Sequence, residues 1–137
     1  MEPENLPIGY LIKLADNLLS EGINHIHAAN GINRTAWQLL HILQEEKASN
    51  ITYLVEVMRP FCNATQVREN LEQLASINLV ERTTDHSFSL TNEGLELHAR
   101  CFKQQQGFRI IIMQNISAED YATTVETLRK MVANLSG

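Results

Sequence analysis

The stretch from Asn50 to Leu90 constrains the fold most, because its apolar pattern changes from helical to extended. A short helix and a turn come first, and a second helix follows. The apolar residues of the second helix recur at the spacing of one buried stripe, at Val67, Leu71, Leu74 and Ala75. Asn63 stands where an N-cap belongs, and Asn78 can end the helix in the left-handed conformation.

A strand–turn–strand pattern follows this second helix. Residues 79–82 begin an extended segment that can pair with residues 88–90 across the turn at 83–87. Helix, turn, helix and hairpin in this order predict a winged helix-turn-helix, which lays one helix in a groove of double-stranded DNA. We therefore expect a mainly α-helical fold with a small β-wing.

Composition and charge limit the classes of function. With 137 residues, 44% of them hydrophobic, the chain can form one domain with a core. It has no long uncharged apolar run, an acidic start unlike a secretory signal, and only two cysteines, so we expect a cytoplasmic protein without a membrane span. The net charge of −5 opposes DNA binding, which depends on neutralising phosphates. The acidic composition would be compensated if four arginines shared the DNA-facing side, namely Arg34, Arg59, Arg68 and Arg82.

The two ends of the chain carry apolar helical patterns that predict a dimerisation region. In the first helix, which follows Pro7, the pattern includes Leu11, Leu14 and Leu18. In the last helix, apolar residues alternate at spacings of four and three, at Tyr121, Val125, Leu128, Val132 and Leu135. We expect residues 1–32 and 92–137 to form the dimer and residues 33–91 to read DNA. Packing within one chain is the alternative.

Smaller signals predict where other elements begin. Thr35 and Gln38 fit a capping box that starts the second helix, and residues 48–50 read as a loop. Thr91 caps the long helix after the wing. Its expected buried stripe contains Leu95, Ala99 and Phe102.

Three segments make the chain similar to the MarR family (multiple-antibiotic-resistance regulators). They are INRTAWQLLHIL, ATQVRENLEQLASINLVER and FSLTNEGLEL, and Leu-Thr-x-x-Gly in the last is the most characteristic. The resemblance covers residues 6–135. It implies a winged-helix homodimer that binds pseudo-palindromic operator DNA, usually as a repressor. It also implies release of the DNA by a small aromatic ligand, an oxidant or a metal, and it implies no cofactor.

Two features depart from the family pattern. Family wings carry Asp-x-Arg before the second strand, but no arginine follows Asp85, so Arg82 or His86 would have to reach the minor groove. The segment MRPFCNATQ between the paired helices is longer than usual and contains Pro60.

The candidate DNA-binding residues fall into three groups. Phosphates would meet the starts of supporting helices at Arg34, Thr35 and Thr52. Base edges would meet the second helix of the pair at Asn63, Ala64, Thr65, Gln66, Arg68, Glu69 and Asn70. The wing would contribute Arg82, Thr84 and His86. The alternative is that these residues are caps and a solvated face, and the charge of Glu69 opposes phosphate contact.

Other chemistry finds less support in the sequence. The spacing of His25, His27, His41, His98 and Cys101 is too loose to predict a metal site. Cys62, just before the second helix of the pair, is a candidate redox residue. The alternative is that it is only a small hydrophobic residue buried in the core. Catalytic motifs are lacking, so we do not expect an enzyme. The second hypothesis for function is a winged-helix protein-interaction module or co-regulator that has lost or weakened DNA binding.

Overall fold

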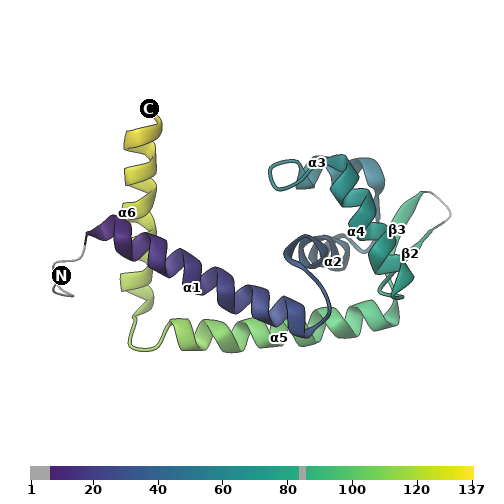
Figure 1. The fold of residues 1–137 in the computed structure, drawn as a ribbon, viewed down its shortest axis with the longest axis horizontal. Coiled ribbons are helices and arrows are strands. Elements are labelled where there is room, and N and C mark those ends of the chain that lie inside the picture. The colour runs from purple at the N-terminus through teal and green to yellow at the C-terminus, as the bar shows by residue number, and fades with distance from the viewer. Residues whose placement is uncertain (1–6, 84–85) are drawn as a thin grey trace. The chain divides into compact units, whose positions relative to one another are not determined.

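A computed structural model describes residues 7–83 and 86–137. Their elements, in chain order, are α1 (Ile8–Ala29), α2 (Arg34–Glu46), β1 (Ser49–Asn50), α3 (Ile51–Met58), α4 (Ala64–Ser76), β2 (Val80–Arg82), β3 (Ser87–Leu90), α5 (Asn92–Ile112) and α6 (Ala118–Ser136) (Figure 1). They form two compact units. The one ending at Gln105 is called the reader unit, and the one from Gln106 to Gly137 the C-terminal unit.

The core of the reader unit lies where α2, α3, α4, α5 and the wing pack together. Its most buried apolar side chains are Leu39, Leu40, Leu43, Leu54, Met58, Val67, Leu71, Leu74 and Cys101. The stripe predicted on α4 is confirmed, with Val67, Leu71 and Leu74 buried and Ala75 packed partly against them. Since one such side chain contributes about 1.5–3 kcal/mol on burial, this stripe fixes which face of α4 remains outside.

The wing is a three-stranded antiparallel sheet in the order β1-β3-β2. The predicted hairpin is confirmed, with Val80 opposite Leu90 and Arg82 opposite Phe88. The expected loop at residues 48–50 is wrong, because Ser49 pairs with Phe88 and Asn50 with Ser87. A two-residue strand is too short to show a periodic pattern, so only its partner reveals it.

Helix caps follow the sequence in most places. The Oδ1 of Asn63 accepts from the Gln66 amide at 2.8 Å, and the Asn63 amide donates to Gln66 Oε1 at 2.9 Å, which confirms the predicted cap. Asn78 has φ 64° after the end of α4, also as predicted. The capping box at Thr35 is wrong. Asn33 is the N-cap instead, since its Oδ1 accepts from the Ala36 amide, and α2 therefore begins at Arg34. The sequence pattern did not separate the two residues, because Asn and Thr side chains both suit an N-cap.

The Leu-Thr-x-x-Gly segment fastens the wing to α5. Thr91 donates its amide to the Leu79 carbonyl at 3.1 Å and its hydroxyl to the Asn78 carbonyl at 2.6 Å. The Gly94 amide donates to Thr91 Oγ1 at 3.0 Å, which confirms the predicted cap. A Cβ on Gly94 would overlap the carbonyl oxygen of Leu79. Only glycine therefore allows α5 to approach the wing this closely.

The buried face of α5 differs from the predicted one. Gly94, Leu97, His98 and Cys101 are buried, whereas Leu95, Ala99 and Phe102 are exposed. The prediction was wrong because it followed the larger apolar side chains, while the close approach at Gly94 decides which face turns inward.

The C-terminal unit contains the end of α5 and all of α6. Ser117 caps α6, accepting from the Asp120 amide at 2.9 Å. No residue of α6 is buried, and Tyr121, Val132 and Leu135 are among its exposed apolar side chains. None of the helices in the described part of the chain is both long and apolar enough to cross a membrane.

Candidate nucleic-acid interface

The outward face of α4 carries most of the predicted base-reading residues. Asn63, Thr65, Gln66, Arg68 and Glu69 are exposed, and Ala64 and Asn70 are half-buried. This face is turned outward because the opposite stripe of α4 is packed into the core.

Several of these side chains also form local hydrogen bonds. Asn63 and Gln66 hold the capping box, and Asn70 Nδ2 donates to the Gln66 carbonyl at 2.8 Å. The amide group of Gln66 and the carbonyl oxygen of the Asn70 side chain still have capacity for an outside partner. Thr65, Arg68 and Glu69 form no side-chain hydrogen bond or ion pair inside the described ranges, so these three side chains are free to meet an outside partner.

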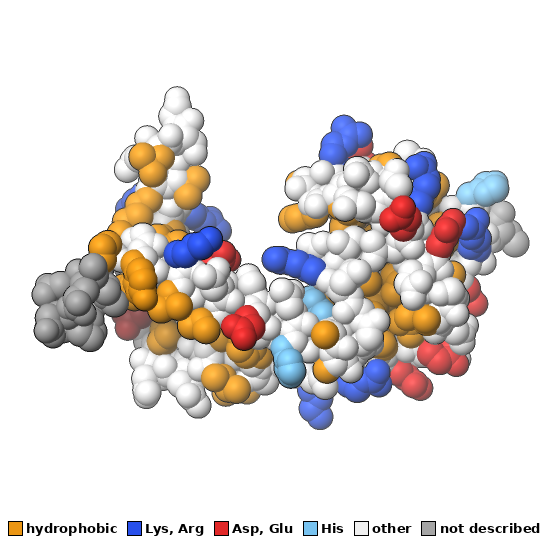
Figure 2. Space-filling model, in the orientation of Figure 1, with side chains coloured by type: hydrophobic (Ala, Val, Ile, Leu, Met, Phe, Trp, Pro, Cys, Tyr) orange, Lys and Arg blue, Asp and Glu red, His pale blue; other side chains and the backbone are white. Residues whose placement is uncertain are grey.

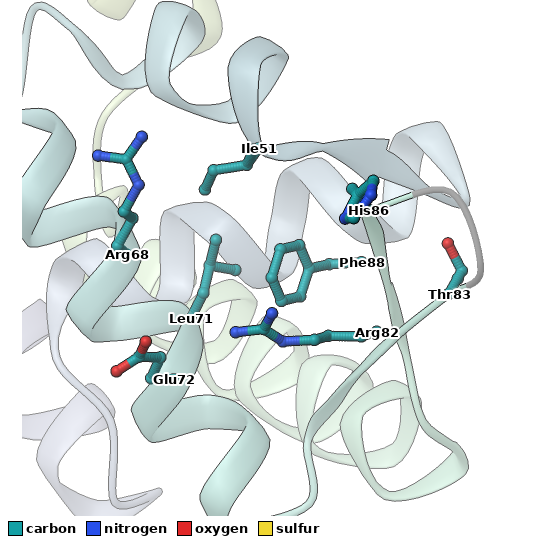
Figure 3. Close-up of a pocket in the computed structure, with 8 residues that line it drawn as sticks. All are labelled: Ile51, Arg68, Leu71, Glu72, Arg82, Thr83, His86 and Phe88. Atoms are coloured by element: carbon teal, nitrogen blue, oxygen red, sulfur yellow. The ribbon is translucent and has the colours of Figure 1, made fainter.

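A hollow of about 310 Å³ separates α4 from the wing (Figure 3). It is lined by Ile51, Arg68, Leu71, Glu72, Arg82, Thr83, His86 and Phe88. The guanidinium of Arg82 lies over the ring of Phe88, 5.4 Å from its centroid, which favours a fixed position for this cation. Arg68 and Arg82 thus bring positive charge to two sides of one hollow, which also has apolar side chains and the negative charge of Glu72 in its wall.

The other two arginines expected on this face have different surroundings. Arg59 forms an ion pair with Glu56 at 2.8 Å on α3. Arg34 is exposed in the first turn of α2, close enough to lower the pKa of His27. Of the four arginines, Arg68 and Arg82 line the same hollow. On the face seen in Figure 2, acidic and basic side chains are interspersed over the reader unit.

The remaining predicted residues lie at helix starts and in the wing. Thr35 is half-buried in the first turn of α2, and Thr52 is exposed in the first turn of α3. Free amides at such helix starts attract anions. His86 is exposed beside the wing turn with φ 58°. Thr84 lies outside the described residues.

The two cysteines lie in or against the core, and no metal site is seen in the described residues. Cys62 is half-buried against the core, and Cys101 is buried. Burial raises the pKa of the Cys101 thiol, although its hydrogen bond with Gln105 acts in the opposite direction. Across residues 7–83 and 86–137, no group of three or more His, Cys, Asp or Glu side chains is arranged to hold a metal ion.

Sequence reasoning missed two features of the reader unit. The first is the hollow itself, whose apolar wall comes from Ile51, Leu71 and Phe88. The second is a column of aromatic rings that brings together His27, His41 and His98, residues treated above as unrelated. Both depend on contacts between distant segments, for which no local pattern of residues exists.

Comparison with known proteins connects this geometry to one fold. No protein-family model matches the sequence, and no curated protein matches it. Many solved structures are similar over nearly the whole chain, and three serve as examples. MarR from E. coli with a cysteine-to-serine change, complexed with operator DNA, has 20% identity and a TM-score of 0.72, and the match covers 94% of this chain and 96% of that one.

The other two are a MarR-family protein of Mycobacterium tuberculosis in complex with DNA and a mutant of MepR from S. aureus. The first has 16% identity and a TM-score of 0.71, with 93% and 98% of the chains covered. The second has 15% identity and a TM-score of 0.77, with 95% and 99% covered. The chain therefore has the winged-helix fold of MarR-family regulators, which confirms the predicted fold class.

Proposed function

We propose that this chain is a MarR-family transcriptional regulator that binds operator DNA as a homodimer. The observation that carries the proposal is the outward face of α4, with the Arg68 and Arg82 guanidinium groups at the hollow beside it. Two of the similar structures, at 20% and 16% identity, are complexes with DNA. By this likeness, α4 would enter the major groove and the wing would lie over the neighbouring backbone.

The placement of charge supports this mode of binding despite the acidic composition. Arg68 and Arg82 are suited to the phosphates or guanine edges between the helix and the wing. The exposed amides at the starts of α2 and α3, beside Arg34 and Thr52, add donors for further phosphates. Because Glu69 on the same face repels phosphate, we expect modest affinity and a strong dependence on salt.

Exposed apolar side chains support the homodimer. On α1, Leu11, Leu14 and Leu18 are 47%, 41% and 57% exposed, and on α6 Val132 and Leu135 are 63% and 90% exposed. Figure 2 shows apolar side chains following α1. Apolar surface of this extent on two helices is typical of an interface. A second copy of the chain would cover it and place two α4 helices on a two-fold symmetric site.

Repression of transcription and release by a small aromatic ligand stay predictions drawn from the family resemblance. The acidic reader unit favours a second candidate function, a winged-helix protein-interaction module with weak or no DNA binding. The two candidates differ in one measurable property, a discrete complex with DNA that weakens with salt.

The test is a gel-shift titration on the DNA upstream of the gene, at low and moderate salt. For a regulator we expect retarded bands that weaken steeply as salt rises. The Arg68→Ala variant should lose about 1–3 kcal/mol of binding free energy without a change in dimer mass. The control is Lys103→Ala, which removes one positive charge from the exposed surface of α5. Unchanged affinity of Arg68→Ala would remove Arg68 from the site, and no complex at any salt would favour the interaction module.

A further inference from the structure

Five nearly parallel aromatic rings from three helices lie together in the reader unit, from the buried His27 to the exposed Phe102, and are called the column. The column contains His27 of α1, Trp37 and His41 of α2, and His98 and Phe102 of α5. Trp37 is central, with its ring centroid 6.0 Å from His27, 5.8 Å from His41 and 4.7 Å from His98. The interplanar angles between contacting rings range from 10° to 25°, so the planes are nearly parallel. These contacts join α1 and α5 to α2.

Two of the histidines share a hydrogen bond that accommodates one proton. His41 Nδ1 lies 3.0 Å from His98 Nε2, and the two ring centroids are 5.3 Å apart. One nitrogen must carry the hydrogen and the other must accept it. If both nitrogens were protonated, two N–H groups would face each other and two like charges would lie with their ring centroids 5.3 Å apart. Glu45, 3.7 Å from His41 Nε2, can balance one positive charge on the pair.

His27 is held in its neutral form by a different set of contacts. It is 2% exposed, and the Gln105 side-chain amide lies 3.2 Å from its Nε2. Because the Gln105 Nε2 group is a donor, His27 Nε2 accepts this hydrogen bond and Nδ1 carries the ring hydrogen. Within the described ranges Nδ1 has no hydrogen-bond partner, and a second hydrogen, on Nε2, would face the Gln105 donor. A charged imidazolium in this position is unfavourable for that reason and because Arg34 lies nearby.

We propose that the column is an acid-sensitive latch, which holds α1 and α5 on α2 at neutral pH and loosens when His27 and His98 take up protons. The charged and titratable side chains around it come from two helices. Arg34 and Glu45 belong to α2, and Arg100 and Cys101 belong to α5. Glu45 is the acidic group among them, and its charge is insufficient to balance protons on both His27 and His98. The inference does not depend on DNA binding.

The direction of the pH effect follows from burial. Burial lowers the pKa of His27 and of His98 from the ordinary 6.5, and positive charge on Arg34 or His41 lowers them further, although Glu45 raises that of His98. The folded state therefore binds fewer protons than the unfolded state. The contribution of neutral His27 and His98 to the free energy of unfolding is fully present above pH 6.5. It decreases as the pH falls through that value toward the lower pKa that these rings have in the folded protein. For each proton taken up on loosening, the equilibrium constant between the closed and the loosened latch changes roughly tenfold per pH unit.

Trp37 provides a direct probe, since it is the single tryptophan of the chain and touches all three histidines. Protonated imidazole quenches indole fluorescence more strongly than neutral imidazole does. We expect the emission of the full-length protein, titrated from pH 8 to pH 5 with EDTA present, to fall in a transition with its midpoint below 6.5. Proton NMR of the histidine rings in the same samples would assign the transition to residues.

Matched variants identify the groups responsible. His98→Gln should make the transition smaller, leaving the part that comes from His27, while His25→Gln and His86→Gln, at exposed positions, should leave it unchanged. Glu45→Gln should move the midpoint to lower pH, because the negative charge that favours protonation of His98 is lost. If His98→Gln does not fold, the NMR titration of the wild-type rings decides instead.

Two results would overturn the latch. One is constant Trp37 emission between pH 8 and pH 5 together with histidine rings that titrate at 6.5 or above. The other is a transition as large in His98→Gln as in the wild type, or one that disappears in His25→Gln. The experiment contains no DNA, so its failure would leave the proposed regulator function untouched, and a failed gel shift would leave the latch untouched.

Discussion

Replacing Gly94 by alanine tests the packing that joins the wing to α5. The added Cβ would overlap the carbonyl oxygen of Leu79, which is backbone and cannot rotate away. Helix α5 or strand β2 must therefore move. The movement would stretch the two hydrogen bonds that Thr91 donates to the carbonyls of Asn78 and Leu79.

The magnitude combines three effects. Overpacking of this kind costs about 1–3 kcal/mol. Each weakened hydrogen bond costs about 0.5–1.5 kcal/mol. In the opposite direction, alanine stabilises the interior of a helix by about 0.5–1 kcal/mol relative to glycine. We therefore expect Gly94→Ala to lower the free energy of unfolding by about 1–5.5 kcal/mol.

The assay is urea unfolding followed by circular dichroism, at one fixed protein concentration because a dimer makes stability depend on concentration. The matched control lies in the same helix. Gly107 has no heavy atom within 4 Å of an added Cβ, so Gly107→Ala should stabilise the protein by about 0.5–1 kcal/mol. If Gly94→Ala is as stable as Gly107→Ala, the close approach between Gly94 and Leu79 does not exist in solution.

Two further predictions concern the start of α4 and the dimer. Asn63→Ala should destabilise the protein by about 1 kcal/mol in urea unfolding, while Asn63→Asp, which keeps an acceptor oxygen, should retain most of the stability; equal loss in both variants would argue against the cap. Val132→Glu should convert a dimer into a monomer by light scattering at micromolar concentration, because a buried charge at an apolar interface is unfavourable. Lys130→Glu, an exposed change on another side of α6, should leave the mass unchanged, and a wild-type monomer would refute the interface.

Much of the candidate interface could be predicted because it depends on local patterns. The stripe of Val67, Leu71 and Leu74 requires one face of α4 to be buried, and this alone places Arg68 and Glu69 outside. Asn63 and Asn78 mark the ends of α4 through hydrogen bonding and backbone preference within a few residues.

The errors arose where a contact between distant segments overrides the local pattern. Asn33 and Thr35 both satisfy an N-cap pattern, and only the observed cap decides between them. The buried face of α5 turns toward the wing because Gly94 meets Leu79, whereas the sequence drew attention to Leu95 and Phe102. Strand β1 exists only because β3 lies beside it.

The sequence by itself determined the order of the helices and of the β2–β3 hairpin, the buried stripe of α4 and the apolar faces of α1 and α6, since each follows from the period of a single helix or hairpin. The tertiary structure decided that Arg68 and Arg82 line one hollow and that His27, His41 and His98 stack around Trp37. These residues lie far apart in the chain, and side chains distant in sequence become neighbours only when helices and strands pack together.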